Sequence, residues 1–391
     1  MLDYINTENG LQAYCLKNEN GEYIIAFRGT DDLSIDPFSW YGENTSQYKE
    51  ARNFVEKIIN NPEINNSNLT FTGHSLGGIL TAQLSVEFGV KGYAYNPFGA
   101  NLLEYKNYKK YADVIKEWSD NNIYTISYQD EGLINGDILS NLVTDLFGAH
   151  IGKYIPIFGK NQGSNIFDGG HSINTLNTAI AEYNEIVKKF DNSCRYEDIT
   201  NMYLSTAIIH GNGYEKVKEE FTKLGVYGAT DNSLHLNVIT PTSSVTSIFS
   251  GSNLSTPALY ALVNLNPFIV SGVNSNAYAE LEKYKAEYSE NYVSDKAKMF
   301  KALMDTPKVG SYYDDYETGK KISYYTSVTD PDSTDEYNLT DTAYTFGTNK
   351  NDIVTASVGK ANRIYTLAGD DRITLSSGSN YKFINLNLLV A

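Results

Sequence analysis

The sequence predicts an α/β fold with a mostly parallel sheet, and three observations support this prediction. Short β-type segments alternate with helix-type segments through residues 1–184, as in sheets whose parallel strands are joined by crossover helices. A glycine-flanked turn at residues 73–78 connects one such strand to one such helix. The chain has 391 residues, more than a single core usually needs. We therefore expect an α/β domain over residues 1–184 and further structure after it.

The elements of this domain follow from the spacing of apolar side chains. Leu11, Ala13 and Cys15 alternate with polar residues, and the apolar run 23–27 follows a turn at 18–21, which predicts two strands over residues 10–27. Residues 47–59 have apolar side chains at helical spacing, and Pro62 follows them. The other expected elements are strands at 69–72, 92–96 and 122–129 and a helix at 79–88.

After this domain the sequence pattern changes. Helical spacing occurs at 183–190, 214–224 and 277–303. The apolar stretch 257–270 is expected to be a buried helix, with contact to acyl chains as the alternative. Residues 185–342 are thus expected to form a mainly helical region and linker of unassigned role. Residues 343–391, rich in Gly, Asn and Asp, are expected to be a separate segment.

Composition excludes some classes of function. The formal net charge is −16 and the isoelectric point is about 4.8, which argues against nucleic acid as a partner because phosphate binding needs clustered Lys and Arg. The two cysteines, Cys15 and Cys194, are expected to be buried thiols, with a single disulfide as the alternative. The start of the chain lacks the features of a Sec-type signal peptide, and no apolar run has membrane-spanning length.

Residues 73–77 fit the pattern Gly-x-Ser-x-Gly, in which a serine lies on a sharp strand-to-helix turn. Glycines keep side chains out of the crowded turn, and the serine adopts a strained backbone conformation. The helix that follows directs its N–H groups and the positive end of its dipole toward the seryl oxygen. The pattern predicts Ser75 as a nucleophile.

A seryl hydroxyl needs a base, which in turn needs an acid to orient it. In α/β folds with this turn, the chain order is serine, acid, histidine. His171 follows a glycine turn and precedes a helix-like stretch, so it is the expected base, with His150 as the alternative. Asp130 directly follows the strand at 122–129 and is the expected acid, with Asp137 as the alternative.

Two N–H groups must stabilise the oxyanion that develops during acyl transfer. Leu76, directly after the nucleophile, offers the first. Thr30 offers the second, because it follows Gly29 at the end of an early strand, where the backbone can approach closely. The loop at 31–45 contains Phe38, Trp40 and Tyr41, which either form a lid over the site or fill the core.

Residues 26–30, Gln47 with Tyr48, and residues 72–78 together resemble the class 3 lipase family, which contains fungal lipases and bacterial phospholipase A1-like enzymes. The resemblance covers residues 10–178. It implies an α/β-hydrolase fold and hydrolysis of carboxylic esters without a cofactor. By family role, Ser75 is the nucleophile, and Thr30 and Leu76 form the oxyanion hole. The chain begins almost at the first strand of the family fold, so we expect that an N-terminal helical segment of that fold is missing from this sequence.

Residues 347–354 and 367–373 resemble the nonapeptides of repeats-in-toxin proteins. The resemblance implies a short β-roll, with Asp352, Asp370 and Asp371 as candidate calcium ligands. It also implies secretion through a type I exporter, without an N-terminal signal peptide. Only about two copies are present, fewer than the three or more that usually form a stable stack, so the chain is a candidate fragment of a longer protein.

These features lead to one main hypothesis and two alternatives. The main hypothesis is a secreted lipolytic ester hydrolase, of the phospholipase A1 or triacylglycerol lipase type, acting at a membrane or micelle surface. The first alternative is a soluble short-chain esterase. The second is a calcium-dependent secreted adhesin or toxin fragment whose hydrolase domain is inactive. Sequence leaves the lipid head group and the acyl position open.

Overall fold

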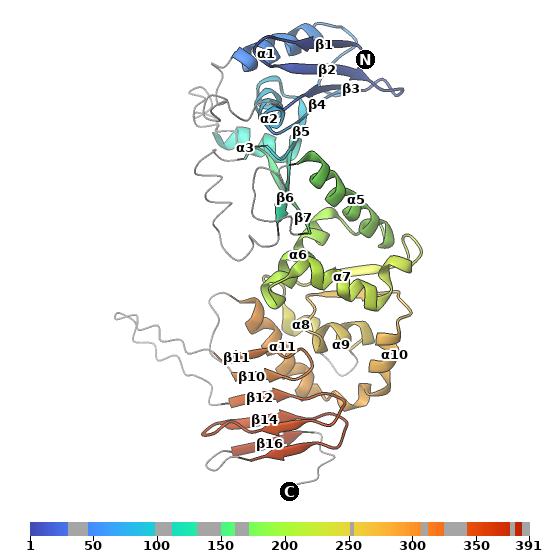
Figure 1. Cartoon of the computed structure of the whole chain (residues 1–391), viewed down its shortest axis with the longest axis vertical. Coiled ribbons are helices and arrows are strands. Elements are labelled where there is room, and N and C mark those ends of the chain that lie inside the picture. The colour runs from blue at the N-terminus through green and yellow to red at the C-terminus, as the bar shows by residue number, and fades with distance from the viewer. Residues whose placement is uncertain are drawn as a thin grey trace, which may run out of the picture. The chain divides into compact units, whose positions relative to one another are not determined.

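The structure is a computed structural model of the whole chain (Figure 1). It describes residues 1–29, 46–97, 112–130, 150–160, 172–250, 254–305, 312–323, 342–375 and 380–384, with the backbone alone at 112–113, 129–130 and 380–384. The chain divides into two compact units, Met1–Tyr183 and Asn184–Ala391. We call them the N-terminal unit and the C-terminal unit.

The N-terminal unit contains a seven-stranded sheet in which the strands follow the chain order. The first three strands are antiparallel, and every later pairing is parallel. The expected mixed α/β fold with a mostly parallel sheet is thereby confirmed. The strands are β1 (Asp3–Asn6), β2 (Gln12–Lys17), β3 (Tyr23–Phe27), β4 (Leu69–His74), β5 (Lys91–Tyr95), β6 (Ile123–Asp130) and β7 (Lys153–Gly159).

Two of these strands, β1 and β7, are absent from the sequence-based expectation. Strand β1 is four residues long, which is too short for a clear alternation. Strand β7 contains Pro156, which argues against a central strand because proline cannot donate a ladder hydrogen bond. The structure resolves this conflict by placing β7 at the edge of the sheet, where it pairs with β6.

Helix α1 (Ser46–Ile59) and helix α2 (Leu76–Phe88) cover one face of the sheet. Their buried side chains join those of strands β2, β3 and β4 in one apolar cluster. Helix α2 begins three residues earlier than expected. Its first turn contains Gly77 and Gly78, and glycine lowers a sequence-based helix prediction. Close backbone packing at the turn nevertheless requires Gly77. Helix α3 (Ala112–Asn122) adds Trp118 to a second cluster, and α5 (Ile173–Lys189) follows β7 along the chain.

The C-terminal unit begins with helices and a two-stranded antiparallel sheet. The elements are α6 (Tyr196–His210), α7 (Gly213–Leu224), β8 (His235–Val238), α8 (Val245–Ile248), α9 (Thr256–Val263), β9 (Phe268–Ser271), α10 (Asn276–Lys283) and α11 (Glu290–Met304). The prediction of one helix at 277–303 is wrong in one respect, because two helices, α10 and α11, occupy this range. Ser289 caps the start of α11 by accepting the N–H of Tyr292. The expected helix at 257–270 ends at Val263, and strand β9 follows.

In the described residues from 312 onward, the C-terminal unit forms a solenoid of mainly parallel strands. In Figure 1, strands β10 (Tyr312–Asp315), β12 (Thr342–Phe346), β14 (Ala361–Tyr365) and β16 (Asn380–Ile384) lie side by side. Thr342 pairs with Ala361, and Ala361 pairs with Asn380, so each of these coils has 19 residues. The short strands β13 (Ile353–Thr355) and β15 (Arg372–Thr374) pair at the same spacing. Strand β11 (Lys321–Ser323) completes the larger sheet, so the expected division at 342/343 cuts through that sheet.

Helix α11 packs on the solenoid through buried polar contacts. Lys296 Nζ lies 2.5 Å from Asp315 Oδ1 on β10, and both side chains are fully buried. One residue earlier, the buried Asp295 accepts the hydroxyl of Tyr365 at 2.5 Å and lies 3.1 Å from Arg363. The helical region and the solenoid therefore share one core.

Both cysteines are free and buried. Burial raises the pKa of the Cys194 thiol to about 12, with Asp198 and Asp191 adding to the shift. None of the described helices is long and apolar enough to cross a membrane.

Candidate active site

Ser75 lies between strand β4 and helix α2, with φ 56° and ψ −121°. This positive φ is uncommon for a residue with a side chain and costs of order 1–3 kcal/mol. Hydrogen bonds hold the conformation: the Ser75 N–H donates to Tyr95 O at 3.0 Å, and the Ser75 carbonyl accepts from Gly78 N at 2.9 Å. Ser75 is 6% exposed. The turn thus has the strained geometry that the motif predicts.

The two glycines of the motif are required by close backbone contacts. A Cβ on Gly73 would lie 2.2 Å from Gly77 O, and a Cβ on Gly77 would lie 2.1 Å from Phe27 O. Both distances are far below van der Waals contact, so only glycine fits at either position. The first turn of α2 therefore packs directly on the backbone at the end of β3.

The end of β3 also lies next to the serine. A Cβ on Gly29 would lie 2.9 Å from His74 O and 3.3 Å from Ser75 Cβ. Thr30, the expected second oxyanion donor, directly follows Gly29 but lies outside the described residues. Leu76, the expected first donor, opens α2, where the first N–H groups of a helix have no helical carbonyl to bind.

The expected acid and base are described only in part. Asp130 is the last residue of β6, with its backbone opposite Gly159 of β7. Because β4 and β6 belong to the parallel part of the sheet, Asp130 and Ser75 lie at the carboxyl edge, where α/β proteins bind ligands. The side chain of Asp130, the alternative acid Asp137 and the base His171 lie outside the described residues. The described chain resumes at Ser172, directly before α5.

The alternative base, His150, is at the wrong edge of the sheet. It lies three residues before the start of β7, and the carbonyl of the next residue, Ile151, accepts the Thr125 hydroxyl at 2.9 Å. The seven-residue strand β7 separates this amino edge from the carboxyl edge by about 20 Å. His150 stacks on Tyr154 with ring centroids 5.0 Å apart. It is a structural residue and not a base for Ser75.

The partly buried position of His150 predicts acid sensitivity. Burial lowers its pKa from 6.5 to about 4, so the folded state favours the neutral ring. Its stabilising contribution is complete above pH 6.5 and is lost as the pH falls toward 4, by about 3 kcal/mol. We expect His150→Phe, which keeps the stacked ring, to lose less stability than wild type between pH 7.5 and pH 4.5 in thermal unfolding. His235→Gln, at an exposed histidine, is the control. Equal pH slopes for wild type and His150→Phe would contradict this account.

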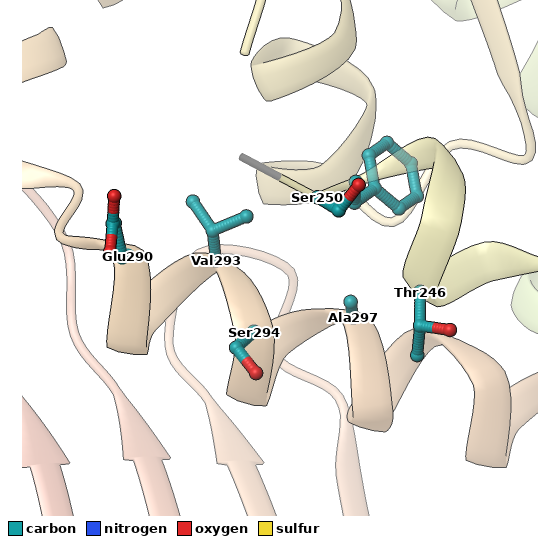
Figure 2. A pocket seen from close by; sticks show the side chains of 7 residues that line it. Thr246, Ser250, Glu290, Val293, Ser294 and Ala297 are labelled. Atoms are coloured by element: carbon teal, nitrogen blue, oxygen red, sulfur yellow. The ribbon is translucent and has the colours of Figure 1, made fainter. Parts of the chain in front are cut away.

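A cavity of about 300 Å³ lies within the C-terminal unit. Figure 2 shows Glu290, Val293, Ser294 and Ala297 of helix α11 on one side of it, with Ser250 and Thr246 opposite. The described residues of its lining offer hydroxyl groups and one carboxylate but no histidine or lysine to activate a hydroxyl. This cavity therefore lacks the parts of a serine hydrolase site.

Two of the three tail aspartates accept backbone hydrogen bonds, one between coils and one within a coil. Asp371 Oδ1 accepts the N–H of Asp352 at 2.9 Å, and Asp352 Oδ2 accepts the N–H of Thr348 at 2.7 Å. Burial raises the pKa of Asp352, whereas Asp370 is exposed. Within the described part of the chain, no three Asp, Glu, His or Cys side chains gather around a possible metal position. Calcium binding therefore stays a prediction.

Residues 1–180 match the family model of a Tle-like phospholipase domain, in the phospholipase-like group. The match covers the sheet, the Ser75 turn and the chain leading into α5, so the site described above lies wholly within it. No match to the chain was found among curated protein sequences.

Among solved structures, the chain has distant similarity to several proteins, including the following two. One is the acylaminoacyl peptidase of Pyrococcus horikoshii, with 12% identity over 47% of this chain and 39% of that chain and a TM-score of 0.26. The other is the capsule O-acetyltransferase of Neisseria meningitidis serogroup A, with 13% identity over 44% of this chain and 83% of that chain and a TM-score of 0.23. The chain thus spans 39% of the length of the peptidase.

Proposed function

We propose that this protein hydrolyses carboxylic esters of lipids, as a phospholipase A1 or a triacylglycerol lipase, with Ser75 as its nucleophile. The observation that carries the proposal is the backbone of Ser75, at φ 56° and ψ −121°, on a turn where Gly73 and Gly77 are sterically required. The match of residues 1–180 to the model of a Tle-like phospholipase domain supports the proposal, because this turn lies within the matched residues. The class 3 lipase resemblance of residues 26–30 and 72–78 agrees with both observations.

The proposed reaction needs no cofactor. Ser75 Oγ attacks the ester carbonyl while His171 accepts the hydroxyl proton, and Asp130 orients the imidazole. The N–H groups of Leu76 and Thr30 stabilise the tetrahedral oxyanion. His171 then donates its proton to the leaving alcohol, and an acyl-serine remains. Water, activated by the same histidine, releases the fatty acid and regenerates Ser75.

We also propose that the solenoid tail is a repeats-in-toxin-like segment. Under this proposal it directs secretion through a type I exporter, and Asp352, Asp370 and Asp371 supply calcium ligands. Its 19-residue coils and the stacked positions of Asp352 and Asp371 support a repeating turn structure. A lipid surface is the proposed partner of the whole protein.

The proposal is tested by assaying the purified protein on phosphatidylcholine vesicles and on the soluble ester p-nitrophenyl butyrate, with calcium and with chelator. We expect release of fatty acid and lysolipid from vesicles, and no release by Ser75→Ala. Hydrolysis of the soluble ester alone would instead identify a short-chain esterase. Inactivity on both substrates would contradict the proposal and favour a binding protein with an inert hydrolase domain. The chelator arm shows whether calcium in the tail affects hydrolysis.

A further inference from the structure

We propose that Asn96 is a positioning residue, which fixes the carboxyl end of strand β6, and with it Asp130, relative to the Ser75 turn. The inference rests on the proposed function, because it concerns the alignment of the acid in that reaction. No motif draws attention to Asn96 in the sequence, where it is a single asparagine after a strand.

Asn96 directly follows strand β5 and is held in an uncommon conformation. Its φ is 42°, in the left-handed region, and it is 6% exposed. Asparagine tolerates this region better than other residues with side chains, but the proline that follows it restricts its backbone further. Pro97 also packs against the first turn of α2, since a Cβ on Gly78 would lie 3.0 Å from Pro97 Cβ. The Asn96–Pro97 turn therefore contacts the helix that begins after Ser75.

Three hydrogen bonds connect this turn to both sides of the site. The Ser75 N–H donates to Tyr95 O at 3.0 Å. The Asn96 N–H donates to Ile126 O at 2.8 Å. The Tyr128 N–H donates to Asn96 Oδ1 at 2.7 Å. A continuous path of backbone and one side-chain amide thus runs from the nucleophile to strand β6.

The side chain of Asn96 substitutes for a missing strand partner. The ladder between β5 and β6 ends at the pair Tyr95 and Ile126, yet β6 continues to Asp130. Beyond that pair, β5 offers no further ladder partner to β6. Asn96 Oδ1 instead accepts the N–H of Tyr128 on β6. Tyr128 lies two residues before Asp130, and its hydroxyl donates to Lys160 O beyond the end of β7. The backbone that carries Asp130 is therefore held from both neighbouring strands.

Loss of this hydrogen bond should disturb the acid and the base more than it disturbs the fold. A displacement of about 1 Å at a catalytic group lowers rates by roughly 100-fold. A displaced carboxylate also stabilises the imidazolium less, which lowers the pKa of the catalytic histidine. The acid limb of the pH profile of kcat/KM should then shift to lower pH, a change that a purely structural residue would not cause.

The test compares Asn96→Gly, which keeps the positive φ but removes the acceptor, with Asn96→Asp, which keeps an acceptor oxygen. The substrate is p-nitrophenyl butyrate, and kcat, KM, the acid limb and the melting temperature are measured. We expect Asn96→Gly to lose about 10- to 100-fold in kcat, with KM within about twofold of wild type and the acid limb moved to lower pH. Asn96→Asp should retain kcat within a few-fold. If Asn96→Gly does not fold, Asn96→Ser, whose side chain is too short for the Tyr128 bond, takes its place.

Asn362→Ala is the matched control, because Asn362 is also buried and accepts a backbone N–H, from Ser357 at 2.8 Å in the tail. It should lower the melting temperature without moving the acid limb. The inference is overturned if Asn96→Gly behaves like this control, or if it leaves kcat unchanged while wild-type activity depends on Ser75. Failure of wild type to hydrolyse any ester overturns the proposed function and this inference together.

Discussion

Ser75→Ala is expected to lower kcat for ester hydrolysis by about 10⁴- to 10⁶-fold. The loss is large because the variant retains the oxyanion donors but has no atom to form the acyl intermediate. Alanine fits the turn as serine does, so the melting temperature should change little. Initial rates on p-nitrophenyl butyrate and on phosphatidylcholine vesicles measure the effect.

Ser85→Ala provides a matched control for this substitution. Ser85 lies on the same helix, α2, and is fully buried. Its hydroxyl has no hydrogen-bond partner among the described residues, so its removal should leave kcat within a few-fold of wild type. Substantial hydrolysis by Ser75→Ala, or an equal loss in Ser85→Ala, would contradict the assignment of the nucleophile.

Lys296→Met is expected to destabilise the C-terminal unit by about 3–5 kcal/mol. Lys296 and Asp315 are both fully buried, with Nζ 2.5 Å from Oδ1. Burial lowers the pKa of Lys296, and the neighbouring Asp315 partly offsets this shift. Removing the lysine leaves the Asp315 carboxylate in the core without its positive partner, which costs far more than the lost contact. Denaturant or thermal unfolding of the C-terminal transition measures the change.

Lys298→Met is the control on the same helix. Lys298 pairs with the buried Asp295 at 2.9 Å, but the lysine itself is 48% exposed. Asp295 keeps Tyr365 and Arg363 as partners when this lysine is removed, so the expected loss is at most about 1 kcal/mol. The double variant Lys296→Met with Asp315→Leu should recover much of the stability, since neither charge then remains buried. A small effect of Lys296→Met alone would show that the pair does not hold α11 on the solenoid.

The fold of the N-terminal unit was largely predictable because its signals are local. Alternating apolar residues mark β2, a continuous apolar run marks β3, and helical spacing marks α1. Helix α6 gave no such signal, because it is buried on most sides and so lacks an apolar stripe. The break between α10 and α11 was also missed, since apolar side chains recur on both sides of it.

The candidate site was predictable only where geometry is encoded within a few residues. Gly73, Ser75 and Gly77 define the turn by their own sterics, so the motif was sufficient there. Whether the alternative base, His150, can serve Ser75 depends on the edge of the sheet that it occupies, which only the topology gives. The place of Asn96 depends on the unequal lengths of β5 and β6, a property of two strands that no single segment contains.

The most direct test of the central claim is reaction of the native protein with a fluorophosphonate, followed by mass measurement of the intact chain and of its peptides. We expect one label per chain, attached to Ser75, with parallel loss of ester hydrolysis and no labelling of Ser75→Ala. Absence of labelling in a folded protein, or a label on another residue with hydrolysis intact after Ser75→Ala, would contradict the account.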